Sequence, residues 1–295
     1  MIASMRNAIL RAAEIVNIPI RVAAARRTPL RVWLVGACLM VSMVVSGCAT
    51  MFAPRSALPA RHTLVLDPLV VYSDFPLPAH HRLVDDVAAE RGELMSKLNL
   101  PRSEEPIHVY LFDTEARFQT FVQQHFPEFP TRRAFFVESD TRLAVYAHWG
   151  DRVSEDLRHE VAHGYLHAVV PDLPLWLDEG LAEYAEVPRG DAGLNRPHVK
   201  LLGTRLASGT WRPDLERLER LDSVADMTQL DYAESWAWVH LLMETDPARR
   251  ELLQSHLQAL RRDGKAPPLS ARLRPMFPQL DILLADHIRS LIGKP

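Results

Sequence analysis

Two histidines four residues apart, with a glutamate beside the first, occupy a stretch that reads as a helix. In "DLRHEVAHGYLH", residues 156–167, they form the pattern His159-Glu160-x-x-His163. On an α-helix, positions i and i+4 lie about 40° apart around the axis and about 6 Å apart along it, so both imidazoles can reach one metal ion. Glu160 lies one step round the helix and can act as a base on a water at that ion without binding it. The alternative is the polar face of an ordinary helix.

A second motif with an acidic residue follows after a short turn, in "WLDEGLAEY", residues 176–184. Together the two motifs resemble the site of the gluzincin branch of zinc metallopeptidases, the broad thermolysin-like and aminopeptidase-like group. In that branch a second helix carries a W-x-x-E-G-x-A-x-Y type of motif. The resemblance implies a zincin-like active-site helix, one Zn2+ per chain bound by His159, His163 and Glu179, and Glu160 as the general base. Two histidines and a glutamate with one open position form a catalytic arrangement for zinc.

The third ligand has a competitor in the same motif. Fifteen residues lie between His163 and Glu179, a few fewer than in the better-known members of the family. Glu183 stands four positions after Glu179 and shares its helix face, so both can approach the ion. The motif favours Glu179, and the resemblance places Glu183 behind a ligand, where we expect it to bond His159 and fix its tautomer. His167 lies about 12 Å along the helix from His159, too far to share a tetrahedral ion, and is expected to be an ordinary polar residue.

The reaction would also need a hydrogen-bond donor to the developing oxyanion, and the later part of the chain offers two candidates. Exopeptidase relatives use a tyrosine on a later helix, which implies Tyr232 in "DYAESWAWVHLL", residues 231–242. His240 is the alternative donor, and packing of Tyr232 beside Trp236 is the structural alternative. The family also places a substrate-aligning edge strand before the active helix. Residues 141–147 would be that strand, unless they pair inside the sheet.

The elements that position these residues read as a β part followed by a helical part. Expected strands are one or two within 62–76, then 106–113, and a hairpin of 133–137 and 141–147. Expected helices are 79–98, 114–126, 153–169, 175–186, 231–245, 247–262 and 277–292. The helical part is broken at five prolines, Pro171, Pro174, Pro188, Pro197 and Pro213. The order predicts a single α+β domain over residues 62–295, with an N-terminal mixed sheet and covering helices before a mostly helical half.

The first part of the chain has the layout of an export signal. Arginines at 26–31 precede the apolar run 32–45, which ends in "SGC" and small residues. The run is shorter than the about 20 residues needed to span a bilayer. The sequence "VSGC" resembles the bacterial lipobox, which implies a lipoprotein signal peptide over 1–47, a lipid on Cys48 and a tether over 48–61. An ordinary signal peptide is the alternative.

Cysteine content and charge set further bounds. Of the two cysteines, Cys38 would be removed with the signal, so no intramolecular disulfide is expected. The chain has a net charge of −3, and residues 1–47 hold six arginines against one glutamate, which leaves −8 for the rest. That balance argues against nucleic acid as a partner, because phosphate backbones need a basic surface.

The sequence therefore predicts a zinc peptidase anchored to the bacterial envelope by the lipid on Cys48. Its expected location is the periplasmic face of the outer membrane, and its expected partner is a peptide or protein substrate. Two alternatives stay open. One is a catalytically silent, zinc-bound module that binds peptides or envelope proteins. The other is a zinc amidase acting on cell-wall material, since the same ligands and base serve any amide.

Overall fold

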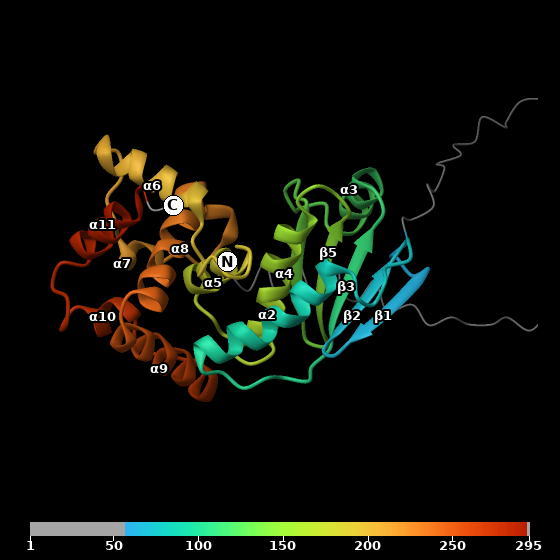
Figure 1. Ribbon diagram of the computed structural model, residues 1–295, viewed down its shortest axis with the longest axis horizontal. Coiled ribbons are helices and arrows are strands. Elements are labelled where there is room, and N and C mark those ends of the chain that lie inside the picture. The colour runs from blue at the N-terminus through green and yellow to red at the C-terminus, as the bar shows by residue number, and fades with distance from the viewer. Residues whose placement is uncertain (1–56, 294–295) are drawn as a thin grey trace, which may run out of the picture.

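The computed structural model describes residues 57–293. A β-sheet with helices packed on it lies beside a group of helices, and the chain builds the sheet part first (Figure 1). This confirms the predicted α+β class. The predicted signal segment 1–47, with Cys48, and most of the predicted tether 48–61 lie outside the described residues. Within residues 57–293, no helix is both long enough and apolar enough to cross a bilayer.

Five strands form one mixed sheet in the order β1-β2-β3-β5-β4. β2, β3 and β5 are parallel, whereas β1 and β4 pair antiparallel at the two edges. The strands are β1 (His62–Leu66), β2 (Leu69–Ser73), β3 (Ile107–Phe112), β4 (Ala134–Ser139) and β5 (Arg142–His148). The predicted hairpin is confirmed as β4 and β5. The expectation of an edge strand at residues 141–147 is wrong, because β5 pairs with β3 and the edge belongs to β4.

Alternate residues of β3 serve two apolar cores, one on each face of the sheet. Ile107, Val109 and Leu111 join the larger core, while Tyr110 and Phe112 join an aromatic one. The larger core includes α2 (Arg82–Leu98) and α4 (Val153–His167), and the aromatic core includes α3 (Glu115–His125). A parallel strand buried on both faces is apolar at nearly every position, which explains the run "IHVYLF", where the half-buried His108 is the one polar residue.

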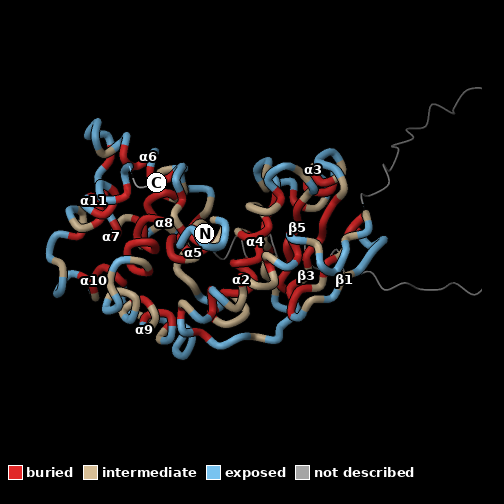
Figure 2. Tube along the Cα trace, in the orientation of Figure 1, coloured by how far each residue is buried: buried red, intermediate tan, exposed pale blue. Residues whose placement is uncertain are grey.

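Helix α4 lies between the sheet and the helical half, and it is largely buried along its length (Figure 2). It packs on β3, β4 and β5, and also on α2 and α5 (Leu175–Ala185). Gly164 allows this approach, because a Cβ added there would lie 3.0 Å from the Ile107 side chain. The helix that carries the His159 and His163 pattern is therefore held on several sides.

The helical half is organised around α8 (Gln229–Glu244), which is buried on all sides and contacts α5, α6, α7, α9 and α11. The remaining elements are α5 (Leu175–Ala185), α6 (Arg196–Ala207), α7 (Leu215–Leu218), η1 (Val224–Asp226), α9 (Pro247–Asp263), α10 (Leu269–Leu273) and α11 (Leu280–Leu291). The sequence did not predict α6. Pro197 was read as a break, yet it sits in the first turn of α6 after the capping Asn195, where proline is favoured.

Candidate metal centre

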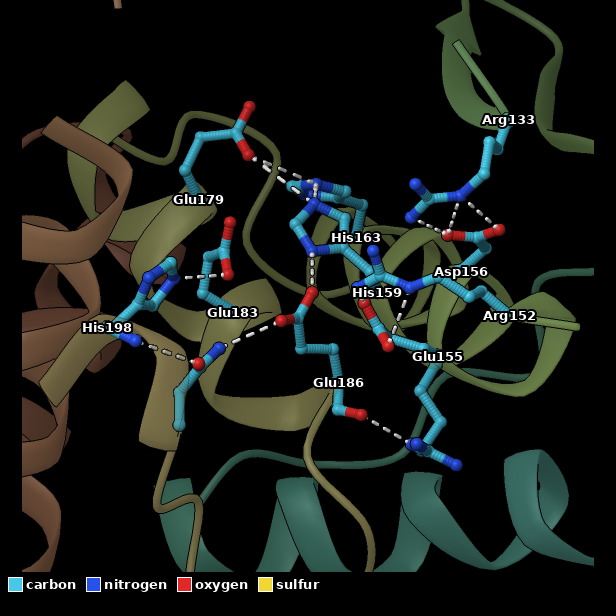
Figure 3. Close-up of polar contacts among 12 residues, drawn as sticks. Arg133, Arg152, Glu155, Asp156, His159, His163, Glu179, Glu183, Glu186 and His198 are labelled. Atoms are coloured by element: carbon cyan, nitrogen blue, oxygen red, sulfur yellow. Dashed lines mark hydrogen bonds and ion pairs between the residues drawn. The ribbon is translucent and has the colours of Figure 1, made fainter. Parts of the chain in front are cut away.

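Three predicted ligands converge where α4 meets α5. The Nε2 atoms of His159 and His163 lie 3.3 Å apart, and their rings are 5.0 Å apart and T-shaped. The Oε2 atom of Glu179, in the first turn and a half of α5, lies 3.5 Å from the Nε2 of His159 and 3.7 Å from that of His163. Figure 3 shows the carboxylate facing both rings. All three side chains are buried or nearly so.

These separations suit a shared tetrahedral ion. Ligand atoms held about 2.0–2.1 Å from zinc in tetrahedral directions lie about 3.4 Å from one another. The three observed separations of 3.3, 3.5 and 3.7 Å fall close to that edge length. His159, His163 and Glu179 could therefore hold a metal ion. That they hold zinc stays a prediction.

The outer ring nitrogens of both histidines contact carboxylates. Nδ1 of His159 donates to Oε2 of Glu186 over 3.2 Å, and Nδ1 of His163 donates to Oδ1 of Asp178 over 2.8 Å. A carboxylate that accepts from Nδ1 fixes the hydrogen on that nitrogen. The lone pair of Nε2 then faces the point between the three candidate ligand atoms. This is the arrangement that metal-binding histidines have in proteins, and the two rings reach it through different acids.

Two other groups of potential ligands surround the same helix, and their contacts are hydrogen bonds. In the group of His163, His167 and Asp178, the nitrogen and oxygen atoms lie 2.8 and 3.0 Å apart. In the group of His159, Glu183 and Glu186, the histidine contact is the 3.2 Å bond to Glu186. A histidine nitrogen at such a distance donates its hydrogen to the carboxylate oxygen. In the group of His159, His163 and Glu179, both Nδ1 atoms already donate to other acids, so three acceptor atoms face one another there, and this group fits a shared cation better than the other two.

Glu183 does not have the predicted partner. The carboxylate that bonds His159 is Glu186, whereas Oε2 of Glu183 lies 2.7 Å from Nε2 of His198 at the start of α6 (Figure 3). The prediction rested on the family resemblance, and in this chain His198 on α6 takes the Glu183 carboxylate while Glu186 reaches His159. Asn195 holds the other oxygen of Glu186 at 2.8 Å.

Arg158, next to His159 in the sequence, anchors the chain that carries Glu186. Its Nε donates to the backbone oxygen of Glu186 over 2.7 Å, and its Nη1 donates to Asp86 on α2 over 2.7 Å. The side chain is buried at 6% exposure. Arg158 thus ties the end of α5 to α4 at Glu186, the residue whose carboxylate reaches His159.

Gly180, beside Glu179, lets α5 approach α8 closely. A Cβ at Gly180 would lie 2.6 Å from the backbone oxygen of Ser235, so any other residue would push the helices apart. This contact brings Tyr232 into the electrostatic surroundings of Glu179 and His159, where it also bonds Arg132. Burial and the Glu179 carboxylate raise the pKa of Tyr232 to about 12, so its hydroxyl keeps the hydrogen it would donate.

His240, the alternative donor, lies in different surroundings. Its Nδ1 is 3.0 Å from Nε2 of His287 on α11, and its ring lies 5.2 Å from that of Trp236. Among the described residues it belongs to no group of metal-ligating side chains. The environment of Tyr232 fits the predicted donor better than that of His240, although its role stays a prediction.

Burial within the site favours Glu160 as a base. Burial raises the pKa of Glu160, against the opposing effect of His159 and His163. Burial lowers the pKa of His163, but Asp178 outweighs it and raises that pKa overall. For His159 the carboxylates of Glu179 and Glu186 likewise outweigh burial. A glutamate with a raised pKa is better matched to proton transfer near neutral pH.

His167 is not the ordinary polar residue that we expected. Its side chain is only 15% exposed and lies between Asp178 on α5 and Glu138 on β4. Burial opposes its charge, but the two carboxylates raise its pKa to about 10. Sequence reasoning missed Asp178, Glu186 and Glu138. Only Asp178 left a signal, because it directly precedes Glu179.

Comparisons with known proteins identify no family. No protein-family model matches the chain, and no curated protein matches it. Among solved structures, it is similar to a mutant M1 zinc metallopeptidase from Deinococcus radiodurans, with a TM-score of 0.39 and 17% sequence identity. The match covers 79% of this chain and 51% of that one, so the chain spans about half the length of that structure. A similarity this distant shows neither a shared fold nor a shared function.

Proposed function

We propose that this chain is a zinc-dependent peptidase of gluzincin type. The observation that supports it best is the convergence of His159 Nε2, His163 Nε2 and Glu179 Oε2 at separations of 3.3 to 3.7 Å. Carboxylates on both outer nitrogens, and Glu160 beside the first ligand, add to it. When bound, zinc would act as a Lewis acid and make water a stronger nucleophile near neutral pH.

The side chains around the candidate metal site have separate roles in the proposed reaction. The Glu160 carboxylate accepts a proton from the attacking water and delivers it to the leaving nitrogen as the C–N bond breaks. The water oxygen becomes part of the new carboxyl group, so atoms and charge balance. Tyr232 donates a hydrogen bond from its hydroxyl group to the oxyanion of the tetrahedral intermediate and keeps its proton. Asp178 and Glu186 hold the two rings in orientation.

The substrate is proposed to be an extended peptide added to the edge of β4. This strand ends the sheet, and its Phe136 ring stacks on His163 with centroids 5.9 Å apart. A peptide paired with a free strand edge is held by main-chain hydrogen bonds, which accept many sequences. Arg133, directly before β4, bonds both oxygens of Asp156 on α4 and so fixes the strand beside the helix (Figure 3).

Export and lipid anchoring through Cys48, at the periplasmic face of the outer membrane, complete the proposal. It is supported by the basic segment, the apolar run and the "VSGC" sequence near the start of the chain. Labelling cells with a radioactive or clickable fatty acid, for the wild type and Cys48→Ala, tests it. Loss of the label and of membrane association in the variant is the expected result.

The activity is tested on casein, short peptides and peptidoglycan fragments with the zinc-loaded chain. Glu160→Gln should keep zinc and lose peptide cleavage by about 100- to 10,000-fold, because it removes the general base. Glu155→Gln, on the same helix but bonded to Arg152, is the matched control and should stay active. Cleavage of peptidoglycan alone would favour the amidase. Bound zinc with no turnover on any substrate would favour the binding module.

A further inference from the structure

A second imidazole stands behind the ligand His163. Asp178 shares its carboxylate between two rings, with Oδ1 at 2.8 Å from Nδ1 of His163 and Oδ2 at 3.0 Å from Nε2 of His167. The other nitrogen of His167 lies 2.7 Å from Oε2 of Glu138 on β4. A continuous chain of hydrogen bonds therefore links the candidate metal ligand to the edge strand.

The roles of the atoms in this chain follow from donor and acceptor chemistry. An ionised carboxylate only accepts hydrogen bonds, so both nitrogens of His167 must donate. His167 is thus a fixed cation that holds Asp178 from one side and Glu138 from the other. Hydrogen bonds with charged partners are about twice as strong as neutral ones, which makes this linkage a firm one.

The two ligand histidines differ in how their carboxylates are held. Glu186, on His159, is fixed by Asn195 at 2.8 Å and through its backbone by Arg158. For Asp178, the oxygen that does not face His163 bonds His167. Loss of His167 would free that carboxylate to rotate away from His163.

Two side chains of the edge strand β4 contact the His167 ring. Phe136 and Glu138 are two positions apart on β4 and so project from the same face of the strand. The Phe136 ring lies 5.2 Å from that of His167 and 5.9 Å from that of His163. Strand β4 thus contacts His167 through both an apolar and a charged side chain.

We propose that His167 is a positioning residue for the metal: it fixes Asp178, which aims His163, and through Glu138 it ties this ligand to the edge strand where substrate would pair. The inference rests on the proposed function, because it assumes zinc at His159, His163 and Glu179. It adds a role for a histidine that contacts neither metal nor substrate.

The test measures the zinc dissociation constant of the full-length chain by competition with a coloured chelator. His167→Phe should weaken zinc binding by up to about 10- to 100-fold, which is the usual cost of losing the partner of a metal ligand, here Asp178. His167→Gln, which keeps an N–H donor for Asp178, should recover part of the loss, and Glu138→Gln should lose less than His167→Phe. His256→Gln removes another buried histidine, on α9, and should bind zinc as the wild type does.

A double-mutant cycle with Asp178→Ala separates this role from general destabilisation. If His167 acts through Asp178, adding His167→Phe to Asp178→Ala should weaken zinc binding little further. Fully additive losses, or a zinc affinity of His167→Phe equal to that of the wild type, would overturn the inference and leave the proposed peptidase intact. Absence of zinc from the wild type would overturn both.

Discussion

Two pairs of histidines in the protein have almost the same distance between their ring centroids. The rings of His159 and His163 are 5.0 Å apart, and those of His240 and His287 are 5.1 Å apart. The closest nitrogens are separated by 3.3 and 3.0 Å, respectively. All four residues are buried or nearly so. Ring spacing and burial therefore do not distinguish a metal site from a packed pair.

The difference lies in the acids around each pair and in the direction of the rings. His159 and His163 belong to one helix, turn the same nitrogen toward one point and have Glu179 as a third group there. His240 and His287 join α8 to α11 through Nδ1 of one ring and Nε2 of the other, 3.0 Å apart. Among the described residues, no third ligand atom joins them within 4.8 Å. Carboxylates, more than histidines, thus define the candidate site.

The largest effect expected from this comparison concerns the two donors on α8. With zinc bound, Tyr232→Phe should lower kcat by about 100- to 1,000-fold, because it removes one donor to the oxyanion. His240→Gln should leave kcat within a few fold of the wild type, since His240 belongs to the packed pair. Steady-state kinetics on the best peptide measure both. The reverse order would make His240 part of the site and erase the distinction between the pairs.

A smaller effect is expected from the outer acids. Glu186→Gln should weaken zinc binding by about 10- to 100-fold, because the amide no longer holds the charge that orients His159. His287→Gln alters the partner of His240 to a similar extent and should leave zinc affinity unchanged. Chelator competition measures both constants. Equal losses would mean that any buried partner of a histidine matters, with no special role for carboxylates.

The smallest expected effect concerns His256, a buried histidine that, among the described residues, no carboxylate holds as Glu186 and Asp178 hold the candidate ligands. His256 is 2% exposed, and burial lowers its pKa to about 4. Since its folded pKa is below its unfolded value of about 6.5, neutral His256 contributes stability above pH 6.5, and this contribution is lost as the pH falls toward 4. One such group changes the free energy of unfolding by at most about 1.4 kcal/mol per pH unit.

The variant His256→Gln should therefore lose less stability than the wild type between pH 6.5 and 4. Denaturant unfolding at several pH values, with zinc absent from both proteins, measures this difference. Parallel curves for the two proteins would show that burial does not depress the pKa of His256, and would weaken the contrast with His159 and His163, whose carboxylates raise theirs.

Local geometry explains which parts of the site could be predicted from the sequence. His159 and His163 are related by one helical turn, so their convergence depends on α4 alone. Glu179 follows from a motif on the next helix along the chain. Glu186 was missed because its contact depends on how Arg158 and Asn195 hold the chain after α5, which is a tertiary arrangement.

The same distinction applies to the fold. The strands and most helices follow from their own apolar periodicity. The order of the last two strands in the sheet, with β5 inside and β4 at the edge, does not. Both strands of a hairpin have similar patterns, and only the pairing of β5 with β3 makes β4 the edge. His167 was misjudged for the same reason, since Glu138 reaches it only because β4 lies there.

Metal content tests the central claim most directly. Mass spectrometry of the purified full-length chain should find close to one zinc in the wild type, in Glu183→Gln and in His240→Gln. His163→Ala and Glu179→Gln should lose most of it, because each removes one of three protein ligands. No zinc in the wild type, or zinc that Glu179→Gln keeps and Glu183→Gln loses, would contradict the account.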